Sequence, residues 1–229
     1  MLLEVIVQSV ADARAATEGG ADRLEVVRAI DQGGLTPLAS IVRGIAAETP
    51  LPLRVMVREN DGFELAPGEL PALRRAAAAF VEGGVDGIVI GFATDGEIVI
   101  DDLLRVIDGL PPVRITFHRA FDSLRDPLAS IPRLTTVKNI DRILTSGGNG
   151  TARERCQRLA SYRAIAGRRI EIIAGGGVDD AALSLFTREG CVREMHVGRA
   201  AREGNEADGP VSAARVRHLK ALMAEGIRD

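Results

Sequence analysis

One recurring phrase constrains the fold of this chain: a glycine or asparagine, a small or branched residue and an aspartate stand directly before a short apolar run. The phrase reads Gly-Ala-Asp ending at Asp22, Gly-Val-Asp ending at Asp86 and, in a degenerate copy, Asn-Ile-Asp ending at Asp141. Each copy follows a segment with helical spacing and opens an extended one. Because such a phrase is typical of a loop that ends a helix and begins a strand, it predicts a repeating αβ architecture.

The segments between these loops predict strands and helices in alternation. Helical spacing is clear where Leu73, Ala77 and Phe80 share one face. Eight strands separated by helices predict a single (β/α)8 TIM-like barrel that takes in residues 1–229 as one domain, because right-handed crossovers force parallel pairing. A doubly wound open sheet is the alternative. The strands are expected at residues 2–7, 23–27, 53–58, 87–91, 113–118, 142–145, 170–174 and 194–197.

Composition narrows the class of protein. The 229 residues are 46% hydrophobic, enough to bury the core of one barrel. The net charge is −3 and acids and bases are interspersed, so no basic stripe suggests nucleic acid or an anionic membrane. The chain has no transmembrane-length apolar span, and its short apolar start lacks the basic leader of a signal peptide. Cys156 and Cys191 form neither a disulfide framework nor a Cys-x-x-Cys pair, so we expect a cytoplasmic protein.

Ionisable residues fall on the strand faces that should point into the barrel. The outward face of each strand packs against helices and should be apolar, so polar residues at period two point inward. An unpaired buried charge costs several kcal/mol, so such residues must pair or serve a ligand. Both interpretations, a structural salt-bridge network and a functional site at the C-terminal strand ends, remain open. The residues concerned are Glu4, Glu25, Arg54, Arg58, His118 and His196.

The fifth strand ends in a run that can carry chemistry. His118 heads it and can act as a general acid or base, with Glu25 as its partner or as a second base. Arg58 and Arg119 would anchor an anion, and Asp122 would complete the site. The alternative is that Asp122 caps the next turn and pairs with Arg119. Glu4 starts its strand, and we expect it to be structural.

Glycine loops follow the last strands, where (β/α)8 barrels often hold phosphate. Glycines let backbone N–H groups approach an anion, so these loops predict a phosphate-binding or carboxylate-binding site. The alternative is that the glycines only make tight turns. The residues concerned are Gly175, Gly176 and Gly177 after the seventh strand, Gly198 and Arg199 after the eighth, and Ser146 after the sixth.

Together these motifs resemble the CutC family, which is named for copper homeostasis. The resemblance rests on Glu4, on GGADRLE at 19–25, GGLTP at 33–37, VMVR at 55–58, FHRAFD at 117–122, LTSG at 144–147, AGGGV at 174–178 and EMH at 194–196. It implies a cytoplasmic TIM-like barrel, often a homodimer, with a role in copper tolerance or binding. The family often has cysteines on its first two strands, but Ile6 and Val27 stand there in this chain.

Two functions follow. The first is a CutC-like copper homeostasis protein. Because Cu(I) prefers soft ligands, losing the strand cysteines leaves His118, His196 and Met56 as the candidate metal ligands. With Glu25, the imidazoles could hold Cu(II) or Zn(II). The alternative is an enzyme of isomerase, epimerase or lyase type, acting on a small phosphorylated or anionic metabolite at the barrel mouth.

Overall fold

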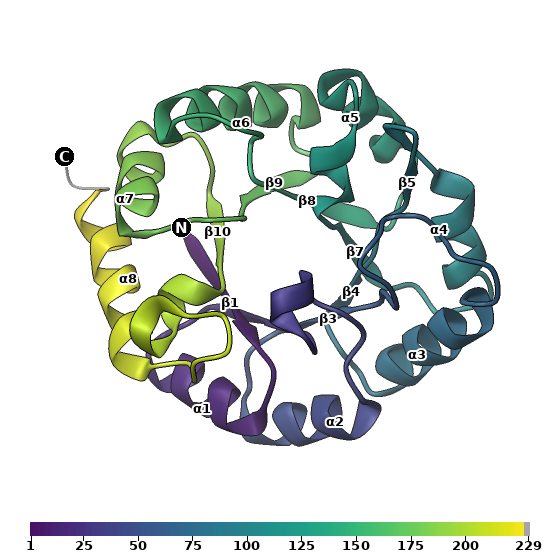
Figure 1. The fold of residues 1–229 in the computed structure, drawn as a ribbon, viewed down its shortest axis with the longest axis horizontal. Coiled ribbons are helices and arrows are strands. Elements are labelled where there is room, and N and C mark those ends of the chain that lie inside the picture. The colour runs from purple at the N-terminus through teal and green to yellow at the C-terminus, as the bar shows by residue number, and fades with distance from the viewer. Residues whose placement is uncertain (227–229) are drawn as a thin grey trace.

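The computed structural model, which describes residues 1–226, is a closed parallel barrel (Figure 1). Its strands are hydrogen-bonded in the order β1-β10-β9-β8-β7-β4-β3-β2, so the first and last strands close the ring. The expected (β/α)8 architecture is confirmed, and the open doubly wound sheet is wrong. The barrel strands are β1 Leu2–Val7, β2 Arg23–Val26, β3 Leu53–Met56, β4 Gly87–Val89, β7 Arg114–Phe117, β8 Ile140–Thr145, β9 Glu171–Ala174 and β10 Glu194–Val197.

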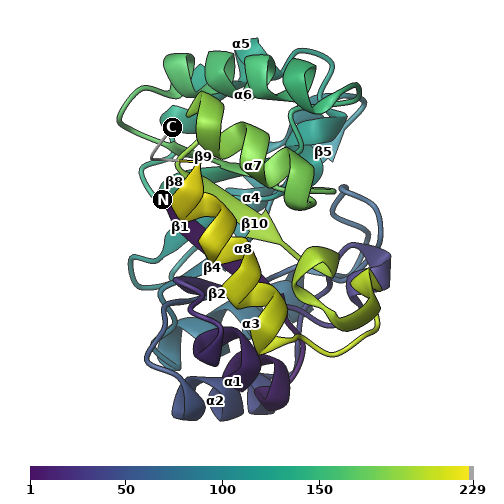
Figure 2. The same ribbon diagram turned by 90° about the vertical axis from the view of Figure 1, so that its left-hand side faces the viewer.

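Helices cover the outside of this ring, and short 3-10 turns gather at its C-terminal end (Figure 2). The turns η1 Ile30–Gln32 and η3 Arg199–Ala201 follow β2 and β10, and a small hairpin of β5 Ala93–Thr94 and β6 Glu97–Ile98 follows β4. Among the described residues, no helix is long and apolar enough to cross a bilayer. The helices are α1 Val10–Glu18, α2 Ala39–Glu48, α3 Leu70–Glu82, α4 Ile100–Ile107, α5 Pro127–Thr135, α6 Ala152–Ala166, α7 Asp180–Glu189 and α8 Ala213–Glu225.

Strand alternation divides the apolar and ionisable side chains as expected. The odd residues of β1, Leu3, Val5 and Val7, are fully buried in the main hydrophobic core. Glu4 lies between them in the sequence and is 1% exposed, yet its carboxylate bonds side chains of β2 and β10. The predicted inward and outward faces are therefore confirmed for this strand. The outer face is apolar because it packs against the apolar sides of the helices, which offer no partner to a buried charge.

The recurring glycine-to-aspartate phrase serves the N-terminal end of the barrel. Gly20 and Gly84 adopt positive φ values of 88° and 76°, which L side chains disfavour. The aspartates that follow accept hydrogen bonds: Asp22 from the amide of Leu3 at 2.7 Å, and Asp86 from the guanidinium of Arg54 at 2.8 Å. Each phrase thus turns the chain and supplies an acceptor beneath the strands.

Buried ion pairs fill this N-terminal end, which we call the base network. Arg54 is fully buried, and it donates to Asp86 and, through two nitrogens, to Asp141 at 2.9 and 2.8 Å. A second group joins Glu194 to the guanidinium groups of Arg23 at 2.6 Å and Arg142 at 2.9 Å. The structural salt-bridge network, one of the two interpretations that the sequence leaves open, therefore exists at the base, and Arg23 connects it to Glu4.

One strand residue differs from its expected placement. Alternation places Arg114 inside the barrel, but its side chain is 65% exposed and reaches Asp86 from the rim at 2.6 Å. Arg114 is the first residue of β7, so nothing beyond it closes the barrel end around its long side chain.

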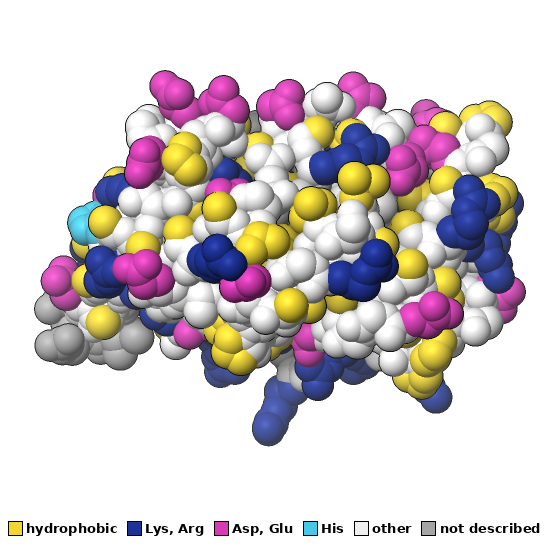
Figure 3. Space-filling model, turned by 90° about the horizontal axis from the view of Figure 1, so that it is seen from below, with side chains coloured by type: hydrophobic (Ala, Val, Ile, Leu, Met, Phe, Trp, Pro, Cys, Tyr) yellow, Lys and Arg dark blue, Asp and Glu magenta, His cyan; other side chains and the backbone are white. Residues whose placement is uncertain are grey.

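The outer surface agrees with the interspersed charge of the sequence. Figure 3 shows acidic and basic side chains alternating with small apolar patches across the face that it presents, without a continuous stripe of one sign.

Candidate functional site

A cavity of about 500 Å³ opens at the C-terminal mouth of the barrel. Its volume falls in the range of small-molecule sites. Apolar side chains of the strand ends, among them Val27 and Met56, form a separate small cluster on its floor. The predicted site residues that line it are Glu25, Arg58, His118, Arg119, Gly176, Gly177, His196, Gly198 and Arg199.

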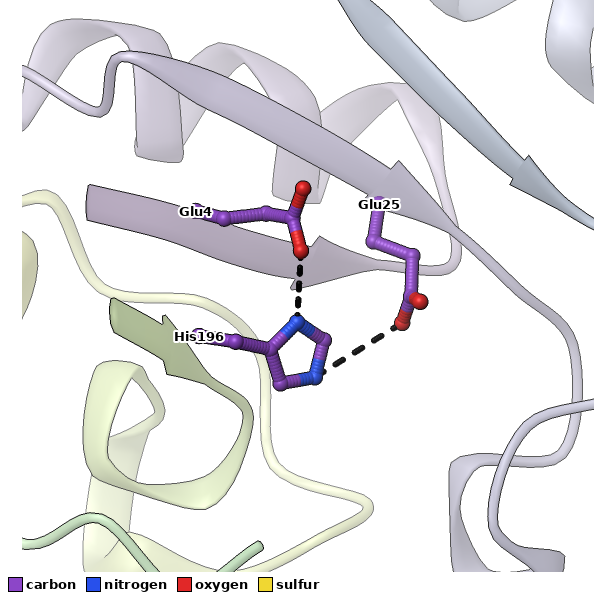
Figure 4. A group of neighbouring side chains, drawn as sticks. All are labelled: Glu4, Glu25 and His196. Carbon is purple, nitrogen blue, oxygen red and sulfur yellow. Dashed lines mark hydrogen bonds and ion pairs between the residues drawn. The ribbon is translucent and has the colours of Figure 1, made fainter. Parts of the chain in front are cut away.

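Three side chains form a buried line at one wall of this cavity (Figure 4). The Glu4 carboxylate of β1 lies 2.7 Å from Nδ1 of His196 on β10. On the other side of the ring, the Glu25 carboxylate of β2 lies 3.7 Å from Nε2. All three are at least nine-tenths buried, and one ligand atom from each lies within 4.8 Å of the others. Barrel closure creates this group, because it places β10 beside β1.

The charges of the three groups depend on one another. Burial opposes ionisation of Glu4, but Arg23 and His196 outweigh it and hold the pKa of Glu4 well below its usual range. Burial raises the pKa of Glu25 to about 7, although the charge of His196 opposes the rise. For His196, burial favours the neutral ring, but the carboxylates of Glu25 and Glu4 outweigh it and raise the pKa. Glu4 is therefore the fixed anion.

One oxygen of Glu25 stands out. Its Oε1 is buried, and no hydrogen-bond partner for it exists among the described residues. Buried carboxylate oxygens are normally paired, so an orphaned one at a cavity wall indicates a missing ligand atom. The sequence predicts Glu25 as the partner of His118, but the neighbour that the structure gives it is His196.

His118 occupies a different part of the wall. Its Nδ1 accepts a hydrogen bond from the amide of Ala120 at 3.2 Å, which leaves Nε2 to carry the proton of the neutral ring. Burial lowers the pKa of His118 to about 3, and the positive charges of Arg58 and Arg119 add to this effect. Across neutral pH, His118 is thus a hydrogen-bond donor to the cavity and not a cation.

The two arginines that the sequence predicts as anion anchors have different surroundings. The Arg58 guanidinium donates to main-chain carbonyls of two loops, including Gly33 at 3.3 Å and Gly62 at 3.1 Å, so it joins the loops after β2 and β3. Arg119 uses only Nε, which donates to Asp122 at 2.9 Å. The alternative pairing of Arg119 with Asp122 is therefore present, but the turn at Arg119–Ser123 is capped by His118 and not by Asp122.

The remaining predicted residues support the wall without lining the cavity. Asp122 accepts hydrogen bonds from Thr145 Oγ1 at 2.6 Å and from the amide of Ser146 at 3.0 Å. It therefore ties the loop after β7 to the loop after β8. Gly175 has no room for a side chain, because a Cβ there would lie 2.6 Å from Leu144 and 3.0 Å from His196. Its small size allows the His196 ring to reach its position.

Sequence reasoning missed two residues of the site. Glu4 is expected to be structural, yet it orients the His196 ring. Arg155 of α6 is not predicted at all, although it donates to the carbonyls of Ser146, Gly176 and Gly177 at 2.6, 2.9 and 3.3 Å. The sequence does contain a signal for Arg155, because it lies in the first turn of α6. In a (β/α)8 barrel the first turn of each helix lies beside the loops of the C-terminal mouth.

Most donors at the mouth fit hard or borderline metals, and the one soft donor among the described residues that line the cavity is the thioether of Met56. Carboxylates and imidazole suit Cu(II) and Zn(II), whereas Cu(I) prefers thiolates and thioethers. The free thiols of Cys156 and Cys191 are buried away from the cavity lining. A Glu–His pair in which the carboxylate holds one ring nitrogen and leaves the other toward an open site is a frequent arrangement around bound metals.

Fold and site together define a (β/α)8 barrel with an ionisable ligand cavity at its C-terminal mouth. A family model described as the CutC family matches residues 1–201, so the chain belongs to the CutC family. The family protein CutC of Xanthomonas campestris pv. campestris (strain 8004) is 34% identical over 215 residues, which cover 93% of this chain and 86% of the relative.

A second relative agrees with this assignment, and a solved structure shows the same fold. The Homo sapiens copper homeostasis protein cutC homolog is 32% identical over 197 residues, covering 85% of this chain and 72% of the human protein. A crystal structure of CutC from Streptococcus agalactiae superposes with a TM-score of 0.78 at 24% identity, covering 86% of this chain and 97% of that one. This structural match supports the barrel fold.

Proposed function

We propose that this protein acts in copper homeostasis, as the human relative's name states of that protein, and that its mouth binds a divalent ion. Glu25 and Nε2 of His196 would be the protein ligands, and Glu4 would orient the ring. Cu(II) is the first ion to test and Zn(II) the second, because the donors are oxygen and nitrogen.

The observation that carries this proposal is the Glu25 carboxylate, whose Oε2 lies 3.7 Å from Nε2 of His196 and whose buried Oε1 has no hydrogen-bond partner among the described residues. The Glu4 carboxylate accepts a hydrogen bond from Nδ1–H of His196, with an N–O distance of 2.7 Å. Nε2 therefore keeps its lone pair for a ligand whenever the ring is neutral. Both ligand residues line the cavity, which leaves further coordination positions open to water or to a small molecule. The sequence predicts His118 as a second imidazole ligand, but the cluster of metal-ligand atoms in the structure contains Glu4 and Glu25 beside His196.

Isothermal titration of metal-free protein with Cu(II), Zn(II) and Cu(I) tests the proposal. We expect one equivalent of Cu(II) to bind and Glu25→Gln and His196→Gln each to weaken binding by about tenfold or more. Glu4→Gln should weaken binding less than His196→Gln, because it acts through the ring. An electron paramagnetic resonance spectrum of the Cu(II) complex should show coupling to a single imidazole nitrogen.

His218 offers a matched control, since it lies on α8 with its side chain 45% exposed and paired with Asp180 at 2.9 Å. His218→Gln should bind Cu(II) like the unaltered protein. The absence of stoichiometric binding of Cu(II) and Zn(II), or binding that survives both Glu25→Gln and His196→Gln, contradicts the proposed centre.

The family resemblance also carries two broader proposals. The first is a cytoplasmic location, which the free thiols of Cys156 and Cys191 support because a reducing compartment keeps thiols free. The second is a homodimer. Sedimentation of the purified protein measures the oligomeric state, and a monomer at micromolar concentration would remove the dimer from this proposal.

A further inference from the structure

We propose that the loops after β7 and β9, which line the same cavity, form an anion subsite for the phosphate group of a small phosphorylated metabolite. The donors would be Nε2–H of His118, the amides of Gly176 and Gly177, and the free end of Arg119. This subsite adjoins the Glu4–Glu25–His196 group, since β9 and β10 are neighbours in the barrel, but it shares no side chain with that group and does not need a metal there.

The loop after β9 presents its amides because its carbonyls are held from behind. Arg155 draws the carbonyls of Gly176 and Gly177 toward α6. Both glycines line the cavity and have positive φ values of 68° and 73°. Within residues 1–226, neither amide donates to a protein acceptor. Backbone N–H groups left unpaired at a cavity wall are suited to phosphate oxygens.

His118 supplies an independent indication of a ligand. Its side chain is 3% exposed, and its ring packs against Phe63 with a centroid distance of 5.5 Å. Nδ1 is fixed as an acceptor by Ala120, so the proton on Nε2 points to a partner that the described part of the chain does not provide. His118 lines the cavity, so an anion oxygen bound there would accept a hydrogen bond from this N–H.

Arg119 completes the subsite with a full charge. Its guanidinium carbon would lie 3.0 Å from a Cβ at position 176, so the glycine there lets the arginine run alongside the loop. Asp122 takes Nε alone, and the terminal nitrogens of Arg119 have no acceptor within residues 1–226. Arg58 adds positive potential nearby, and its charge also contributes to the lowered pKa of His118. Charge-assisted donors of this kind favour phosphate over a neutral ligand.

The size of the cavity favours a phosphate monoester over inorganic phosphate as the natural ligand. A volume of about 500 Å³ leaves room for a small organic body beside the phosphate. That body would lie over Val27 and Met56 and extend toward Glu25. Its oxygen atoms would then lie near the carboxylate of Glu25 and the ring of His196, which can act as acid, base or metal ligand.

Titration calorimetry with inorganic phosphate and glycerol 3-phosphate, in buffer with a chelator, tests the subsite without any metal. We expect both to bind, glycerol 3-phosphate more tightly, and malonate to bind more weakly than either. Arg119→Gln should weaken phosphate binding roughly ten- to a hundredfold, since it removes charge-assisted hydrogen bonds. His118→Asn keeps an oxygen acceptor for the Ala120 amide but removes the Nε2 donor, and should weaken binding as well.

Arg125 provides the matched control, because it is exposed on the same side of the barrel, outside the cavity lining, and donates to the carbonyl of Asp95 at 2.9 Å. Arg125→Gln should leave phosphate affinity unchanged. The inference is overturned if the unaltered protein binds neither probe, if Arg119→Gln binds phosphate as well as Arg125→Gln does, or if malonate binds best. Because the chelator removes metals, failure here is distinguishable from failure of the copper titration.

Discussion

The two ends of this barrel handle buried charge in opposite ways. At the base, Arg54 is fully buried and each of its nitrogens donates to a carboxylate. At the mouth, Glu25 and His118 are almost as deeply buried, yet an oxygen of one and a ring nitrogen of the other have no protein partner within residues 1–226. The Arg54 group at the base pairs its own charges and so holds the strands together, whereas Glu25 and His118 at the mouth leave atoms for a ligand.

The largest expected effect is at the base. Arg54→Met removes one partner of a buried network and leaves Asp86 and Asp141 without it, so we expect the free energy of unfolding to fall by about 3–5 kcal/mol. Urea denaturation followed by circular dichroism measures this. Arg114 reaches the same Asp86 from the exposed rim, so Arg114→Met should cost less than about 1 kcal/mol. Equal losses would break the proposed distinction between buried and rim charges.

The next effect appears on lowering the pH. Burial lowers the pKa of His118 to about 3, so the folded protein keeps the ring neutral where the unfolded chain protonates it. At this ring the folded state binds fewer protons, so the contribution of His118 to stability is complete above about pH 6.5 and falls as the pH decreases toward 3. Between about pH 6.5 and pH 5 this contribution should fall by about 2 kcal/mol, while the raised pKa values of Glu25 and His196 act in the opposite direction.

Urea denaturation at both ends of this pH range, on the unaltered protein and on His118→Asn, isolates the contribution of the ring. The variant lacks the titrating group but keeps Glu25 and His196, so on lowering the pH the unaltered protein should lose about 2 kcal/mol relative to the variant. If both proteins lose the same free energy, His118 is not the buried neutral donor described above.

A smaller effect is expected from the support of the glycine loop. Arg155→Met keeps an apolar stem over Phe186 but removes the donors to Gly176 and Gly177, so the loop should loosen and phosphate affinity should fall several-fold. Faster amide hydrogen exchange at these glycines would accompany the change. Arg158, on the same helix, donates instead to Gly147 and Asn149, so Arg158→Met should not share this effect.

The smallest effect should come from Glu25. Glu25→Gln keeps the shape of a side chain whose one ion pair among the described residues, with His196, is 3.7 Å long, so the free energy of unfolding should change by less than about 1 kcal/mol. The same variant should lose Cu(II) binding. A loss of several kcal/mol would place Glu25 with the base network as a structural charge.

Much of the fold could be predicted, because the recurring phrase and the strand alternation act locally. The phrase ending at Asp22 and Asp86 marks where strands begin, and alternation correctly turns Glu4 and Glu25 inward. The end of the third strand differs from the expectation. Residues 57–58 are expected to extend the third strand, but β3 ends at Met56, since Arg58 leaves the sheet to join two loops.

The sequence by itself determined which side chains enter the barrel, because the two-residue period of a strand and the apolar demand of the helices are local rules. Only the tertiary structure decided their partners. Glu4 and His196 are 192 residues apart and meet because the ring closes between β1 and β10, while Arg155 reaches the glycine loop from a neighbouring helix. Pairing depends on strand register and closure, which the spacing of residues along one strand does not encode.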